Sequence, residues 1–187
     1  MRFLLLSLIL LSCSSEKKLR RKYVPSTDNE ERITYDWSGD GNPETVILSP
    51  ALGPGQYRDI VIYRGVMEGE SKEIIFTNRN LIPRRARPGA TLKLRRDRSF
   101  HITVDSSGSG RTSEVVTWKI SWKRGRYLLT GYSRDWIDKL DPHDHRTCDV
   151  DLRSGRGKRN GKPVKFKPFT VDLIDLNDKF LPSICDF

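Results

Sequence analysis

The sequence contains no apolar run that could cross a bilayer as a helix. Such a helix needs about 20 predominantly apolar residues, and the apolar run at residues 3–11 is far shorter. Arg2 precedes that run, and Ser12 and Cys13 follow it. A basic residue, a short apolar stretch and small residues are the three parts of a secretory signal. The first residues are therefore predicted to direct export and not to form a membrane-spanning anchor.

Patterns of known catalytic sites are also missing. The Gly/Ser-rich segment 106–113 lacks the Gly-x-Ser-x-Gly order of a nucleophile elbow. The glycines at 155–161 have the wrong spacing for a phosphate-binding loop, and Pro163 follows Lys162 where Ser or Thr would hold magnesium. We therefore expect a binding or scaffolding protein and not an enzyme.

Metal-ligating histidines are scarce, because the chain has three histidines in all. His143 and His145 lie close to carboxylates and could ligate zinc. No further ligand follows at a standard spacing, so an ordinary polar loop is the favoured interpretation. An exported hydrolase that uses these two histidines is the least favoured of three functions.

Cysteine is equally scarce, with three in 187 residues. The residues around Cys13 resemble the lipobox of bacterial lipoproteins: Leu10 lies three places before the cysteine and Ser12 directly before it. Leu11 departs from the pattern, because that position is usually smaller. The resemblance implies that residues 1–12 are removed and that Cys13 is diacylated. The alternative is an ordinary signal peptide with an incidental cysteine.

Residues 13–31 are predicted to tether the lipid to the folded domain. This segment is polar and contains a basic run at 17–22, which adds a weak electrostatic attraction to an anionic leaflet. By resemblance to the sorting rules of enterobacterial lipoproteins, Ser14 implies the outer membrane, with the protein facing the periplasm.

The other two cysteines, Cys148 and Cys185, are an even pair in an oxidising compartment. We predict a disulfide between them that ties the end of the chain to the domain. Two separately buried thiols are the alternative.

Positive charge is the main feature of the composition. Lys and Arg number 34 against 24 Asp and Glu, a formal net charge of +10. This balance favours anionic partners, which outside the cytoplasm are lipid headgroups or envelope polymers and not nucleic acid. A charged surface that serves only solubility explains the composition equally well.

A cluster of arginines marks the candidate anion-binding surface. Prolines keep its first part in a loop, and its second part follows on a predicted strand. Aromatic residues do not alternate with these charges as they do in binders of single-stranded nucleic acid. A solvated face is the alternative. The cluster consists of Arg84, Arg85, Arg87, Arg95, Arg96 and Arg98.

A candidate calcium loop lies between two predicted strands, because oxygen-bearing side chains occupy its positions 1, 3, 5 and 9. Calcium takes six to eight oxygen ligands, and the first half of an EF-hand loop supplies them at this spacing. Its residues are Asp36, Ser38, Asp40, Asn42 and Glu44, with Gly41 at the sharp turn.

This loop resembles the hairpin calcium loop of FG-GAP or VCBS-type repeats, in which the ninth residue closes the site. The resemblance implies a structural calcium ion. The alternative is a tight hairpin in which Asp36 and Asp40 bond to their own backbone.

Strand-like runs recur about every ten residues with turn signals between them. The clearest is the alternation at 116–122, where apolar residues including Trp118 and Trp122 would line a buried face, and Arg124-Gly125 would turn the chain. A sugar-stacking tryptophan ladder is the less favoured alternative. Residues 32–187 are predicted to form one mainly β, antiparallel domain with little helix, as a sandwich or a barrel. We find no internal repeat, which argues against a complete propeller.

The C-terminal third is similar to uncharacterised exported proteins of proteobacteria, on the residues at 129–132, 148–155 and 160–163. No activity comes with that resemblance. The favoured prediction is a lipid-anchored cell-envelope protein with a binding or scaffolding role, which calcium stabilises if the loop at 36–44 binds the ion. The second is a basic module that binds anionic envelope polymers or lipid headgroups.

Overall fold

The computed structural model describes residues 31–48, 58–65, 73–82, 89–106, 110–177 and 179–187. Within these ranges the chain forms two antiparallel sheets and two short 3-10 helices, and no α-helix. The predicted mainly β fold with little helix is confirmed, and neither sheet closes into a barrel. The predicted signal segment, Cys13 and nearly all of the predicted tether lie outside the described residues.

The smaller sheet contains the first four strands in chain order. Its second strand, Glu-Thr-Val-Ile-Leu, is buried throughout, as its run of β-branched and apolar residues favours. The strands are β1 (Glu31–Tyr35), β2 (Glu44–Leu48), β3 (Arg58–Arg64) and β4 (Glu73–Ile82).

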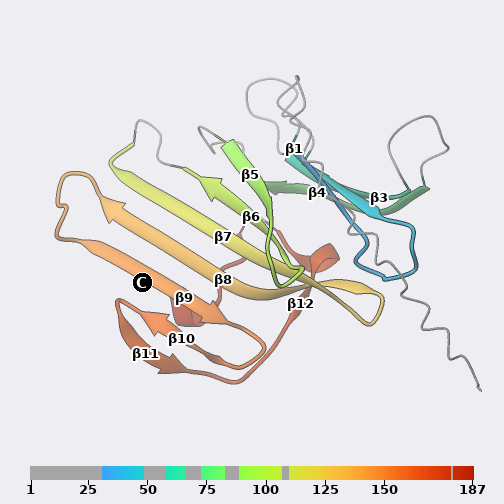
Figure 1. Ribbon diagram of the computed structural model, residues 1–187. Coiled ribbons are helices and arrows are strands. Elements are labelled where there is room, and N and C mark those ends of the chain that lie inside the picture. The colour runs from blue at the N-terminus through green and yellow to red at the C-terminus, as the bar shows by residue number, and fades with distance from the viewer. Residues whose placement is uncertain (1–30, 49–57, 66–72, 83–88, 107–109, 178) are drawn as a thin grey trace, which may run out of the picture.

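The larger sheet has eight strands (Figure 1), seven of which pair with their neighbours in the chain; the eighth, β12, pairs with β8. The strands are β5 (Gly89–Leu94), β6 (Phe100–Asp105), β7 (Thr112–Lys123), β8 (Arg126–Asp138), β9 (His145–Asp151), β10 (Arg156–Arg159), β11 (Lys162–Lys165) and β12 (Val171–Asp172).

The β7–β8 hairpin is the longest pair of strands and supplies part of the core. Arg124 and Gly125 have φ angles of 50° and 79°, the left-handed conformation that a two-residue hairpin turn requires. Trp118 and Ile120 are buried, and Trp122 packs against the core from a half-buried position. The tryptophans therefore pack inward as predicted, and do not form an exposed sugar-stacking ladder.

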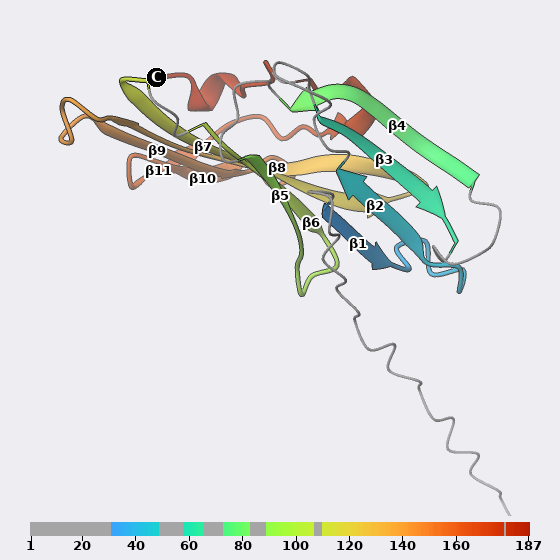
Figure 2. The same ribbon diagram turned by 90° about the horizontal axis from the view of Figure 1, so that it is seen from above.

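One hydrophobic core joins the two sheets and the C-terminal segment. Figure 2 shows the smaller sheet beside the larger one, with the C-terminal segment in red running along the larger sheet. Removing apolar surface from water is the main source of stability, at about 25 cal/mol per Å². The fully buried side chains from the two sheets include Leu48, Ile60, Ile62, Phe100, Ile102, Ile120 and Leu129.

Trp37 connects the two sheets. Its indole N–H donates to the carbonyl oxygen of Arg98 at 2.7 Å, and its ring meets those of Phe100 and Tyr127 edge to face. The sheets also meet where the backbone N–H of Leu92 on β5 donates to a carboxylate oxygen from β1. These contacts fix the turn between β5 and β6 against the smaller sheet.

The C-terminal segment is held by buried polar contacts. It contains the 3-10 helices η1 (Leu173–Asp175) and η2 (Ser183–Cys185). The side-chain amide of Asn78 on β4 is buried and donates to the carbonyl oxygens of Leu173 and Leu176, at 2.6 and 2.7 Å. A buried amide with two acceptors carries little desolvation penalty, so this contact secures η1 to the smaller sheet.

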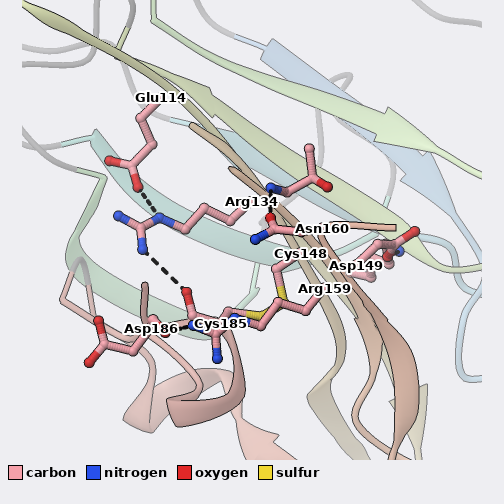
Figure 3. The surroundings of a disulfide bond; sticks show 10 residues. Glu114, Arg134, Cys148, Asp149, Arg159, Asn160, Cys185 and Asp186 are labelled. Carbon is pink, nitrogen blue, oxygen red and sulfur yellow. Dashed lines mark hydrogen bonds and ion pairs between the residues drawn. A yellow bond between two sulfur atoms is a disulfide. The ribbon is translucent and has the colours of Figure 1, made fainter. Parts of the chain in front are cut away.

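A disulfide joins Cys148 on β9 to Cys185 in η2, across 37 positions of sequence (Figure 3). Arg134 donates to the carbonyl oxygen of Cys185, and Arg159 donates to that of Asp186. Covalent and polar contacts together hold the end of the chain on the larger sheet.

Candidate functional site

The larger sheet has a polar face opposite the core, which we term the outer face. Successive side chains along a strand point to opposite faces of a sheet. On β6, for example, Phe100, Ile102 and Val104 are buried, whereas His101 and Thr103 between them are half-buried. The residues that pair with His101 and Thr103 on neighbouring strands share this face.

One line of paired residues crosses the outer face from β5 to β11, and we term it the cross-strand row. Residues directly opposite each other in adjacent strands lie side by side on the same face. Strands are about 4.8 Å apart, so six steps give a row about 29 Å long. The row consists, in order, of Lys93, His101, Lys119, Gly131, Asp151, Arg156 and Lys165.

Positive charge predominates in the cross-strand row, where Asp151 is the one carboxylate among four lysines and arginines. Lys93, Arg156 and Lys165 are exposed. Arg156 and Lys165 lie directly opposite each other, and like charges in that arrangement destabilise a sheet. An anion bound between them would relieve that repulsion.

A second line, beside the cross-strand row, carries hydroxyl groups. The hydroxyls of Thr103 and Thr117 are hydrogen-bonded at 3.0 Å across β6 and β7. Thr91 on β5 and Ser133 on β8 extend the line on both sides. The centre of the outer face therefore offers short polar side chains beside long basic ones.

A β-bulge interrupts the outer face between β7 and β8. Lys119 pairs with Gly131 and the next residue pairs with Leu129, which leaves Thr130 as the extra residue. A Cβ atom on Gly131 would lie 2.8 Å from the Cδ atom of Lys119. Glycine therefore lets the Lys119 side chain cross β8 and form an ion pair with Asp149 on β9, at 2.5 Å.

A pocket of about 150 Å³ lies at this bulge. Its lining includes His101, Lys119, Ser121, Thr130, Gly131 and Arg153, with Asp97 and Asp151 also contributing. Burial lowers the pKa of His101, and the charges of Arg95 and Lys119 lower it further. The imidazole is therefore mostly neutral at pH 7, in a pocket that also contains cationic donors.

The β5–β6 turn holds the described part of the predicted arginine cluster. Arg95, Arg96 and Arg98 are exposed there, close in sequence to the pocket residues Asp97 and Ser99. Arg98 has a φ angle of 66°. The predicted partners Arg84, Arg85 and Arg87 lie outside the described residues.

The candidate calcium loop closes on itself. Asp36 accepts the backbone N–H groups of Gly39 and Gly41 through its two oxygens, at 2.7 and 3.0 Å. Asp40 accepts from the N–H of Asn42 at 2.8 Å. The Ser38 hydroxyl lies 3.4 Å from Asp36. These are the contacts of a tight Asx-type turn.

Glu44, the ninth loop residue, is fully buried. One carboxylate oxygen accepts the backbone N–H of Trp37 at 2.7 Å, and the other has no hydrogen-bond partner among the described residues. A buried carboxylate oxygen without a donor is costly and is suited to a cation. Within the ranges described above, however, no three His, Cys, Asp or Glu side chains form a group that could hold a metal ion. Calcium binding by this loop stays a prediction.

Neither His143 nor His145 belongs to a group of three His, Cys, Asp or Glu side chains, among the described residues, that could hold a metal ion. His145 lies 2.7 Å from the carboxylate of Asp135, and both side chains are about half exposed. The backbone N–H of His143 donates to Asp141. Each histidine thus has ordinary surface contacts.

Neither the pocket nor the cross-strand row is predictable from the sequence. The alternation along residues 100–105 predicts that His101 lies on the polar side of its strand, but the other residues of the pocket come from four separate segments of the chain. The alternation of polar residues along β6, β7 and β9 was the signal available. Their alignment depends on the strand register and on the extra residue Thr130.

Comparisons with known proteins add no relative. No family model, no curated protein and no solved structure matches this chain. In the part of the chain that the structure describes, no helix is long and apolar enough to cross a membrane. What the protein does must therefore be inferred from its own residues.

Proposed function

We propose that this chain is a lipid-anchored protein of the bacterial cell envelope whose β-domain binds a linear anionic polymer on its outer face. The role is binding and not catalysis. The polymer is of the phosphate- or carboxylate-bearing kind found in envelopes, and the predicted diacylated Cys13 holds the domain at the membrane. The outer membrane, with the domain facing the periplasm, is the proposed location.

The observation that carries this proposal is the cross-strand row. Four cationic side chains lie along a line about 29 Å long, as the strand spacing gives. A linear polyanion can contact such a line at several points at once, so weak contacts add up through effective concentration. Arg95, which is exposed in the β5–β6 turn, adds a further positive charge near His101.

Binding of dextran sulfate by the full chain, kept in a neutral detergent, tests this function, with uncharged dextran as the reference polymer. We expect binding at low salt that weakens steeply between about 0.1 M and about 1 M salt, because the Debye length falls from about 10 Å to about 3 Å. Lys93→Gln with Lys165→Gln removes the two ends of the row. An exposed ion pair contributes up to about 1 kcal/mol, so this double variant should bind about fivefold to twentyfold more weakly.

The matched control is Arg79→Gln with Lys179→Gln, which removes the same charge from two exposed residues outside the larger sheet. Its affinity should stay within about twofold of the unchanged chain. Equal weakening in both double variants would show a general charge effect and contradict the row. Binding to phosphatidylglycerol vesicles without binding to dextran sulfate would instead favour a lipid-headgroup surface.

A further inference from the structure

The pocket at the β7–β8 bulge is too small for a whole ligand of the usual size. Pockets for drug-sized molecules measure about 300–1,000 Å³, whereas this one measures about 150 Å³. It opens on the outer face, within the cross-strand row, through His101, Lys119 and Gly131. One small chemical group of a larger molecule is therefore the ligand that its size admits.

The carboxylates at the pocket already have local donors. Asp97 accepts from the backbone N–H and the hydroxyl of Ser99, at 3.1 and 2.6 Å, and the hydroxyl bond is the main cause of its lowered pKa. Asp151 accepts from the backbone N–H groups of Arg153 and Ser154, at 2.9 and 3.1 Å. These hydrogen bonds partly offset the negative charge of the two carboxylates and stabilise the two turns.

The cations at the pocket retain donors for a ligand. A lysine ammonium has three N–H donors and an arginine guanidinium has five. The ammonium of Lys119 contacts Asp149, and one guanidinium nitrogen of Arg153 contacts Asp151 at 3.3 Å. The remaining N–H groups, with His101 between them, favour a group with several acceptor oxygens.

The charges around His101 indicate the same ligand class. Four charged side chains act on the imidazole: Arg95 and Asp97 from the β5–β6 turn, Lys119 from β7 and Asp149 from β9. The positive charges of Arg95 and Lys119 lower the pKa of His101 more than the negative charges of Asp97 and Asp149 raise it.

We propose that this pocket is an oxyanion subsite that takes one phosphate or carboxylate group of the anionic polymer, and that His101 takes up a proton from solvent when the group binds. This inference rests on the proposed function, which it deepens by naming the group recognised. A bound oxyanion adds negative charge beside the imidazole, which favours the protonated ring. Binding is then tighter below about pH 6 than at about pH 8.

Titration of the full chain with sulfate, followed by the NMR signals of the histidine rings, tests the subsite. Sulfate is chosen because its own charge is constant over this pH range. The chain has three histidines, so His143 and His145 serve as internal controls. We expect the His101 signals alone to shift, and the sulfate affinity to be about tenfold higher at about pH 5.5 than at about pH 8.

His101→Gln removes the titrating group and should make sulfate affinity independent of pH, whereas His143→Gln should change nothing. Arg153→Gln keeps the histidine and should weaken sulfate binding at every pH. If the His101 signals do not respond to sulfate while dextran sulfate still binds, the subsite is wrong and the polymer-binding face stands. If dextran sulfate does not bind either, the proposed function fails as well.

Discussion

His101 is a half-buried base whose protonated form is disfavoured in the folded protein. Burial is the largest cause of its lowered pKa, followed by the charges of Arg95 and Lys119. In the unfolded chain the imidazole regains an ordinary pKa near 6.5. The unfolded state therefore binds the proton more readily, and the free energy of unfolding falls as the pH falls through 6.5 to the lower folded pKa.

His101→Gln removes this contribution. Relative to the unchanged chain, the variant should gain stability progressively as the pH falls below 6.5, with a constant difference above about pH 7.5. Urea denaturation at a series of pH values, in buffers without sulfate or phosphate, measures this difference. A difference that is the same at every pH would show that the fold does not perturb His101.

Gly131 shows what a single residue type contributes to the outer face. Nothing in the sequence indicates that Gly131 lies beneath the side chain of Lys119. Nor does it indicate that Lys119 reaches an acidic partner two strands away. The ion pair between Lys119 and Asp149 spans β8 because that position has no side chain. The alternation at 116–122 predicts only that Lys119 lies on the polar side of its strand.

The loop between β1 and β2 is the element whose role is most sharply testable. A ligand that binds only the folded state adds RT ln(1 + [L]/Kd), about 2.7 kcal/mol at a hundredfold excess. For a chain of this size that corresponds to a rise of about 5–10 °C in Tm. If the predicted calcium ion binds, calcium should raise the Tm of the full chain relative to chelator, and Asp40→Ala should remove the rise.

Asp175→Ala, which removes one exposed carboxylate from η1, is the matched control and should keep the calcium effect. A Tm unchanged by calcium would leave residues 36–44 as the self-bonded turn that the contacts of Asp36 and Asp40 form. Burial of Glu44 in the core was not predictable from its loop position, because burial depends on packing between the two sheets.

The C-terminal segment is the element most dependent on a covalent bond. Linking Cys148 to Cys185 across 37 positions restricts the unfolded chain, which the chain-entropy model values at about 3–4 kcal/mol. Replacing both cysteines by serine should lower the Tm by about 6–16 °C. Calorimetry of the double variant measures this loss. An unchanged Tm would show that the contacts of Arg134 and Arg159 hold the segment without the disulfide.

At the scale of the whole molecule, the strands were predictable and their alignment was not. Alternation along residues 116–122 identified a buried face, and Arg124-Gly125 identified the turn, because both signals are local. The cross-strand row depends on the register of six strand pairs, including one shifted by Thr130. The predicted anion-binding cluster consists of arginines that are close together in the sequence. Strand pairing instead brings together basic residues that are far apart in the chain.

The placement of charge therefore matters more for the proposed function than the net charge of +10. A uniform cationic surface would bind a polyanion anywhere, whereas the cross-strand row defines one line on one face. Mapping the backbone amide NMR signals of the full chain during a dextran sulfate titration distinguishes these two situations most directly.

We expect amide signals along the row, from Lys93 through Lys119 to Arg156 and Lys165, to shift together with one Kd. Signals of β1 to β4 should stay in place. Shifts confined to the smaller sheet or to the basic residues at 17–22, with the row unaffected, would contradict binding at the outer face.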